Sequence, residues 1–164
     1  MTIGQGDTLV TPLQIAVGLS AIANGGYRCA PHVGLRVQRP DGTVVDEIEP
    51  RCNRELPFTA AQLAFVRQAL ATVPVSGTAA GAFRNFPFSA VSVAGKTGTA
   101  EVGPFQDYSW FAAMAPVEDP QYVVVVLVEQ GGHGSTTAAP IVRSIIEGLF
   151  GLPHTGFVNG GETD

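Results

Sequence analysis

Three strand-like segments follow one another in the second half of this 164-residue chain, with only short connections between them. They cover about residues 90–101, 109–115 and 121–129, and a Gly-Pro and an Asp-Pro pair mark the turns. Short connections favour antiparallel pairing, because a parallel neighbour needs a long crossover. The sequence therefore predicts an antiparallel sheet at the centre of the fold.

The last of these segments is apolar at every position from 123 to 128. A strand of this kind is usually covered on both faces and central in its sheet. Since no later strand follows it, we expect its second neighbour to come from sequence that precedes residue 1. This pattern is the first indication that the chain is part of a larger domain.

Three segments have helical periodicity, at residues 8–24, 59–73 and 138–149. Thr11 and Thr59 are the expected N-caps of the first two helices, and a proline at position 74 is expected to end the second. The first helix is predicted to bury a stripe made of Leu13, Ala16, Val17, Ala21 and Ile22. The second is predicted to bury Leu63, Val66, Leu70 and Val73. Together with the sheet, these helices predict an α+β fold over residues 1–150.

A β-hairpin is predicted over residues 33–49, with its turn at Pro40-Asp41-Gly42. Cys29 and Cys52 are almost equidistant from this turn, so the hairpin could bring them together. The register decides whether they form a disulfide or stay as two thiols.

Composition excludes several classes of function. The chain is 45% apolar and 14% charged, with a net charge of −5 and no basic run, so nucleic acid is not an expected partner. Its apolar runs are far shorter than the roughly 20 residues of a membrane helix, and no signal peptide is visible after Met1. A polar, Gly-rich tail at residues 151–164 is expected to be disordered.

No metal site is predicted, because the histidines are scattered and the cysteines lack ligand spacing. Surface or structural roles are expected for His32, His133 and His154. Packing roles are expected for Phe83, Phe86, Phe88 and Trp110.

The segment GKTGTAE, at residues 95–101, contains Lys96, the only lysine of the chain. On an edge strand, Thr97 and Thr99 would share one orientation, and Lys96 and Gly98 the other. An extended peptide could add alongside such a strand, and Gly98 would let it come close. The plain alternative is a glycine-containing strand with one exposed lysine.

The same residues suit acyl-transfer chemistry. The backbone N–H of Thr99 could donate to a developing oxyanion. The hydroxyls of Thr97 and Thr99 could bind a terminal carboxylate, and the charge of Lys96 would favour that carboxylate.

Several segments resemble one known family. The motifs are I-G-Q-G-D-T-L-V-T-P-L-Q-I-A, I-A-N-G-G, V-S-G-T-A, V-A-G-K-T-G-T-A-E, S-W-F-A-A-M-A-P and G-G-H-G-S-T-T-A-A-P-I-V-R. In this order, over residues 3 to about 150, they resemble the penicillin-binding transpeptidases, most closely the membrane-anchored class B type that serves cell elongation. The fold implied is the C-terminal half of a penicillin-binding/β-lactamase-like transpeptidase domain.

The resemblance implies a function. Members of the family use a serine to attack the penultimate D-alanine of a peptidoglycan stem peptide, and penicillins acylate the same serine. Lys96, Thr97, Gly98 and Thr99 match the family's K-T-G element, with Lys96 and Thr99 as catalytic residues and Thr97, Gly98 and Thr99 as substrate-binding residues. No cofactor is implied. The expected partners are D-Ala-D-Ala stem peptides, β-lactams, the missing N-terminal half and a cell-wall elongation complex, at the outer face of the bacterial membrane.

Two elements of the family's signature are absent from this sequence. S-x-x-K requires a lysine other than Lys96, and no serine has Asn or Asp two positions later. Both elements precede these segments in the family, so we expect the chain to be inactive alone. It could be a natural truncation, an engineered piece or part of a longer gene.

Two alternatives to a transpeptidase remain. A serine β-lactamase or D,D-carboxypeptidase also has K-T-G, although the segments around positions 3–16 and 109–116 favour a transpeptidase. A non-catalytic module that binds peptides or β-lactams would also lack the two missing elements.

Overall fold

The computed structural model of the protein describes residues 8–154, apart from the side chains of residues 53–55. The elements are α1 (Pro12–Ala23), β1 (Tyr27–Cys29), β2 (Arg36–Gln38), β3 (Val44–Glu47), β4 (Cys52–Glu55), α2 (Ala60–Val75), β5 (Ala94–Ala100), β6 (Tyr108–Ala115), β7 (Tyr122–Val128) and α3 (Ala138–Leu149). Strands β5, β6 and β7 form an antiparallel sheet in that order. The predicted α+β fold is confirmed. Most of the tail predicted to be disordered, residues 155–164, lies outside the described residues.

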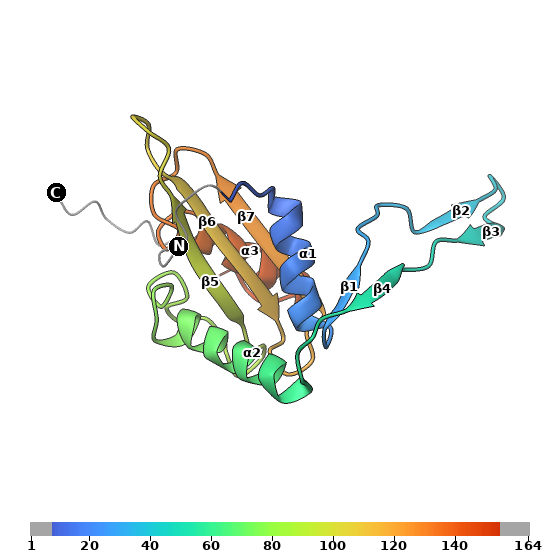
Figure 1. Cartoon of the computed structure of the whole chain (residues 1–164), viewed down its shortest axis with the longest axis horizontal. Helices are drawn as coiled ribbons and strands as arrows, with labels where there is room; N and C mark the ends of the chain where they lie inside the picture. Colours follow the sequence, from blue (N-terminus) through green and yellow to red (C-terminus); the bar gives the residue numbers. More distant parts are fainter. Residues whose placement is uncertain (1–7, 155–164) are drawn as a thin grey trace.

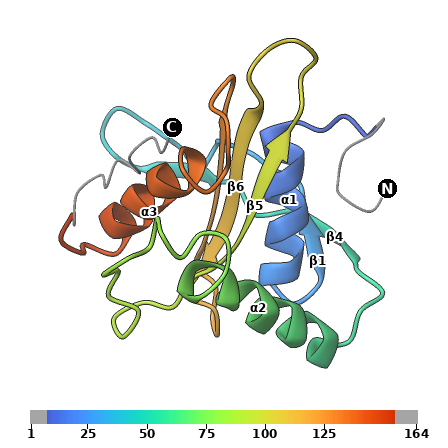
Figure 2. The same cartoon turned by 90° about the vertical axis from the view of Figure 1, so that its left-hand side faces the viewer.

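Helices cover both faces of this sheet (Figures 1 and 2). On one face, α1 and α2 pack over a small core that includes Met114 of β6 and Leu70 of α2. On the other face, α3 and the segment 76–91 pack over a larger core that includes Phe111 of β6 and Val142 of α3. Strand alternation separates these two cores, because neighbouring residues of one strand point to opposite faces.

The phenylalanines of the segment before β5 belong to the larger core. Phe83 and Phe86 are buried, and Phe83 lies within ring-contact distance of Phe86, Phe88 and Phe111. The predicted packing role of these aromatic residues is confirmed.

The first two helices begin with the same device. The hydroxyl of Thr11 accepts a hydrogen bond from the backbone N–H of Gln14, and the hydroxyl of Thr59 accepts one from the N–H of Gln62. In return, each glutamine side chain accepts a hydrogen bond from the backbone N–H of its threonine. These two capping boxes satisfy N–H groups that a helix start leaves unpaired, so the predicted N-caps are confirmed.

The prediction that Pro74 ends the second helix is wrong, since α2 continues two residues beyond the predicted end at residue 73. Pro74 lies inside the last turn of α2, which continues to Val75, and the N–H of Ser76 closes the helix on the carbonyl of Thr72 at 2.9 Å. A proline this close to the end disturbs only the final turn, and its ring is buried there.

The predicted apolar stripes are only partly right. Ala21 and Leu63 are buried, but the side chains of Leu13 and Val66 are 57% and 38% exposed. Both helices have apolar residues on more than one side, so periodicity alone did not select the covered side. In the described part of the chain, no helix has the length and apolar character needed to cross a bilayer.

Residues 27–55 form an arm that extends away from the body of the molecule (Figure 1). Strands β2 and β3 are the predicted hairpin, and the unpredicted strands β1 and β4 pair at its base. Cys29 lies opposite Cys52 there, and the two form a disulfide. The hypothesis of a Cys29–Cys52 bond is therefore confirmed.

The outer edge of β7 has no strand partner among residues 8–154. The helices α1 and α3 contact its two faces, and all its residues after Tyr122 are half-buried. A strand covered on both faces but open along one edge agrees with the expectation that this sheet continues in another segment.

Candidate active site

The four residues of the predicted site lie together on β5, at one edge of the sheet. Thr97 is paired with Phe111 and Gly98 with Trp110 of β6. Among the described residues no strand pairs with the other side of β5. The edge position assumed from the sequence is therefore confirmed, and backbone groups on this side can pair with an added strand.

The two orientations predicted along this strand are also observed. Lys96 and Gly98 line a groove beneath α1. The hydroxyl of Thr97 instead contacts Thr78, in the segment that packs on the same face of the sheet as α3. Because neighbouring side chains of a strand point to opposite faces of the sheet, the charge of Lys96 and the hydroxyl of Thr97 lie on different faces.

The ammonium group of Lys96 is exposed, and its Nζ donates a hydrogen bond to the carbonyl of Thr97 at 2.7 Å. Because of this contact, the Lys96 side chain lies alongside β5. A cation held there is close to the edge at which a carboxylate could bind.

A groove of about 430 Å³ lies between α1 and the β5–β6 pair. Its lining is largely apolar, and consists of Val10, Gln14, Ile15, Gly18, Leu19, Ile22, Lys96, Thr97, Gly98, Trp110 and Ala112. Trp110 is half-buried and forms part of this wall. Its predicted packing role is therefore only part of what it does.

Gly98 is favoured by close packing within the sheet. A Cβ atom at this position would lie 3.1 Å from the Cβ of Trp110. From the sequence, this glycine is expected to allow the close approach of a peptide, and the contact with Trp110 is a second reason for a residue without a side chain.

A loop at residues 131–137 crosses the motif on the opposite face. A Cβ on Gly134 would overlap the backbone of Gly98 and Trp110, so only glycine fits where the loop meets the sheet. The fully buried hydroxyl of Ser109 fixes this loop, because it donates to the carbonyl of His133 and accepts from the N–H of Ala138, both at 3.0 Å.

Two residues that contact the motif, Gly134 and Thr78, are not predicted as site residues from the sequence. Both lie in segments that resemble the family, G-G-H-G-S and V-S-G-T-A. The signal was therefore present, but the contacts join residues far apart along the chain.

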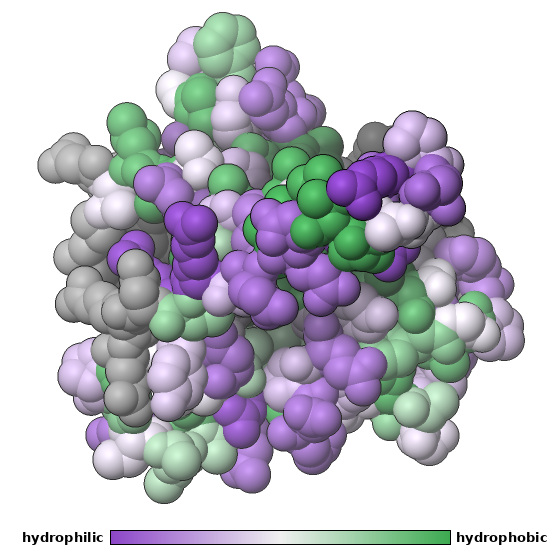
Figure 3. All heavy atoms as spheres, turned by 90° about the vertical axis from the view of Figure 1, so that its right-hand side faces the viewer, coloured by the Kyte–Doolittle hydropathy of each residue, from purple (hydrophilic) through white to green (hydrophobic). Residues whose placement is uncertain are grey.

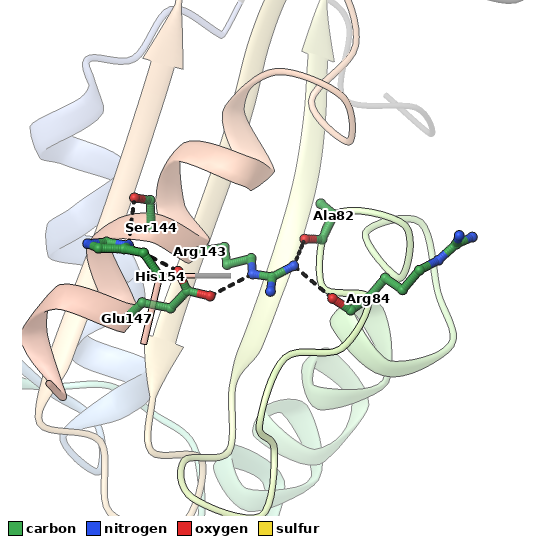
Figure 4. A network of polar contacts seen from close by, with 6 residues as sticks. All are labelled: Ala82, Arg84, Arg143, Ser144, Glu147 and His154. Carbon is green, nitrogen blue, oxygen red and sulfur yellow. Dashed lines mark hydrogen bonds and ion pairs between the residues drawn. The ribbon is translucent and has the colours of Figure 1, made fainter. Parts of the chain in front are cut away.

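A second polar group, formed by two residues of α3 and a histidine that follows it, resembles a Ser–His–Glu relay (Figure 4). Ser144 Oγ and Glu147 Oε2 lie 3.4 and 3.2 Å from the same atom, Nδ1 of His154. A relay needs the hydroxyl and the carboxylate on opposite ring nitrogens. The three residues therefore lack the geometry of such a relay, and a surface or structural role for His154 stays a prediction.

Comparison with known proteins identifies the family. Residues 1–147 match the family described as "Penicillin binding protein transpeptidase domain". The chain is 36% identical over 157 residues to the peptidoglycan D,D-transpeptidase PbpA of Mycolicibacterium smegmatis, covering 88% of this chain and 30% of that protein. It is 32% identical over 166 residues to MrdA, a peptidoglycan D,D-transpeptidase of Haemophilus influenzae, covering 88% of this chain and 24% of that protein.

Solved structures of penicillin-binding proteins have the same fold as this chain. Penicillin-binding protein A of Mycobacterium tuberculosis, in an imipenem acyl-enzyme complex, superposes with a TM-score of 0.76 at 32% identity, covering 90% of this chain and 32% of that one. The PBP2 of Pseudomonas aeruginosa superposes with a TM-score of 0.68 at 30% identity, covering 99% of this chain and 34% of that one. The chain thus spans about a third or less of the length of these relatives. On both sequence and fold, it belongs to the transpeptidase family of the penicillin-binding proteins.

Proposed function

We propose that this chain forms the K-T-G wall of a peptidoglycan D,D-transpeptidase, an enzyme that cross-links stem peptides by serine acyl transfer. One observation carries the proposal most directly: Lys96, Thr97, Gly98 and Thr99 lie in order on the open edge of β5, beside a groove of about 430 Å³. Family membership supplies the type of reaction.

In this proposal the stem peptide pairs with β5 as an added strand. The N–H of Thr99 donates to the oxyanion that forms on the penultimate D-alanine carbonyl. The hydroxyls of Thr97 and Thr99 receive the terminal carboxylate, and Lys96 supplies the positive charge that attracts it.

The nucleophile is proposed to come from another part of a longer protein. S-x-x-K cannot occur around Lys96, the only lysine, and the chain covers 30% of its relative PbpA. The apolar groove beneath α1 and the open edge of β7 are the two surfaces at which the rest of the domain would pack. The isolated chain would then be inactive.

The same serine would react with β-lactams. Two solved relatives from M. tuberculosis are acyl-enzyme complexes with imipenem and with ceftriaxone. From membership of the family, we also propose that the longer protein acts at the outer face of the bacterial membrane. An anchor and a cell-wall elongation complex would hold it there.

A fluorescent penicillin tests the proposal. The full-length protein should be labelled covalently, whereas the 164-residue chain alone should not. Lys96→Ala in the full-length protein should slow labelling by roughly 10²-fold or more, as expected when a group that acts on the reacting centre is removed. Labelling of the isolated chain would contradict the proposed division of the site.

Product analysis separates the alternatives. A transpeptidase joins stem peptides when an acceptor amine is present, whereas a carboxypeptidase or a β-lactamase transfers the acyl group to water. A full-length protein that binds penicillin without a covalent bond would support the non-catalytic module.

A further inference from the structure

The turn that follows α2 brings a second hydroxyl to the motif. The Oγ1 atoms of Thr78 and Thr97 lie 2.8 Å apart, although the residues are 19 positions apart in the sequence. Thr78 is exposed and Thr97 is half-buried. This pair of hydroxyls lies on the wall to which the proposed function assigns carboxylate binding.

The backbone around Thr78 is fixed from both sides. The N–H of Gly77 donates to the carbonyl of Thr72 at 2.9 Å, and a Cβ on Gly77 would lie 2.8 Å from the Cα of Val73. Glycine therefore permits the turn to fold closely against the end of α2. Ala79, on the other side, is fully buried, and its N–H donates to the carbonyl of Val73 at 3.1 Å.

A buried arginine holds the next turn. Arg143 of α3 donates from Nη1 to the carbonyls of Ala82 and Arg84, at 2.8 and 2.9 Å (Figure 4). Its Nε is paired with Glu147 at 2.8 Å. The segment that presents Thr78 is thus attached to both α2 and α3, so its hydroxyl has a defined position relative to β5.

Proton counting shows what such a pair can do. Each hydroxyl has one proton and accepts through its lone pairs. The hydrogen bond between Thr78 and Thr97 uses one of the two protons. The other proton is left to donate outward, and the bond within the pair restricts where it points. A carboxylate at this edge would therefore meet one oriented donor.

We propose that Thr78 is a positioning residue for carboxylate recognition at the K-T-G motif. It acts through Thr97, by holding the side chain of Thr97 and directing the free proton of the pair toward the ligand. The ligands are the terminal carboxylate of a stem peptide and the carboxylate of a β-lactam. This inference rests on the proposed transpeptidase function.

The test compares variants of the full-length protein. Thr78→Val has a similar shape but no hydroxyl, Thr78→Ser restores the hydroxyl, and Thr97→Val removes the residue through which Thr78 acts. The second-order rate constant of acylation is measured with benzylpenicillin and with its methyl ester, which lacks the anionic carboxylate. Melting temperatures control for folding.

Thr78→Val should lower the rate constant for benzylpenicillin about tenfold, as expected for weakening one hydrogen bond to a charged group. Its rate constant with the ester should stay near that of the wild type, and Thr78→Ser should recover at least half of the loss on a logarithmic scale. In the Thr97→Val background, Thr78→Val should cause little further loss, because both changes affect one donor.

Each contrary result has a distinct meaning. Equal rate constants for Thr78→Val and wild type with benzylpenicillin would overturn the positioning role, while the transpeptidase proposal would stand. A parallel loss with acid and ester would assign Thr78 a purely structural role. A wild-type protein that no penicillin acylates would overturn the proposed function, and this inference with it.

Discussion

Arg143 and Glu147 lie one turn apart on α3 and form a buried ion pair, with Nε 2.8 Å from Oε1. Their side chains are only 5% and 3% exposed. Because Arg143 also donates to two carbonyls of the segment before β5, the pair joins α3 to the residues that lead into the candidate active site.

Replacing only one partner of this pair should be strongly destabilising. Arg143→Met removes the cation that pairs with the buried carboxylate of Glu147 and the donor to two backbone carbonyls, and we expect a loss of about 3–5 kcal/mol in the free energy of unfolding. Denaturant titration measures it. The double variant Arg143→Met with Glu147→Leu should lose less, since it buries no carboxylate that has lost its arginine. An equal or larger loss in the double variant would show that the ion pair itself is not the cause.

Gly134→Ala should disrupt the loop that crosses the motif. The added methyl group would overlap the backbone of Gly98 and Trp110, which cannot move as a flexible side chain can. We expect a destabilisation of about 1–3 kcal/mol, typical of overpacking, measured by thermal unfolding. Gly148→Ala is the matched control. Its Cβ would meet nothing within 4 Å on helix α3, so stability should rise by about 0.5–1 kcal/mol. A neutral Gly134→Ala would contradict the close contact between loop and strand.

Reduction should loosen the base of the arm. The disulfide joins cysteines separated by 23 positions, and closing a loop of this size stabilises a fold by roughly 3 kcal/mol in the chain-entropy account. We expect no free thiol before reduction and two afterwards by thiol titration. Limited proteolysis should then cut between Cys29 and Cys52 faster, whereas the sheet should stay protected. Unchanged cleavage would show that strand pairing holds the arm without the disulfide.

Acid should remove one stabilising contact near the start of β5. Ser92 donates to Glu118 Oε2 at 2.6 Å and holds the pKa of that carboxyl below its ordinary value of 4.5. A carboxyl whose pKa is lowered by folding contributes stability above its unfolded pKa, and the contribution is lost as the pH falls through the folded pKa. Stability measured from pH 6 to pH 3 should therefore fall less steeply in Glu118→Gln than in the wild type. Identical profiles of stability against pH for the wild type and Glu118→Gln would show that the Ser92–Glu118 contact does not contribute to stability.

The hydrogen bond between Ser92 and Glu118 shows how much depends on distant segments. These residues are 26 positions apart, and no local pattern links them. The lowered pKa of Glu118 could therefore not be predicted from the sequence.

Local patterns were sufficient for most of the elements and for the motif. Residues 138–149 have helical periodicity, and α3 has those bounds. Alternation along residues 94–100 correctly separated the orientation of Lys96 from that of Thr97. Both results depend only on neighbours within a few positions, where backbone geometry fixes the direction of each side chain.

Tertiary structure decided what those side chains meet. Thr78 reaches Thr97 because the segment that follows α2 comes back to β5. Arg143 reaches Ala82 because α3 and that segment pack on the same face of the sheet. Tertiary packing also determined which sides of α1 and α2 are buried, since both helices have apolar residues on several sides. The sequence by itself determined the helices, the strands of the central sheet, the hairpin of the arm and the place of the K-T-G motif on a strand. The partners of that motif depend on contacts between segments 19 to 61 positions apart, which only packing brings together.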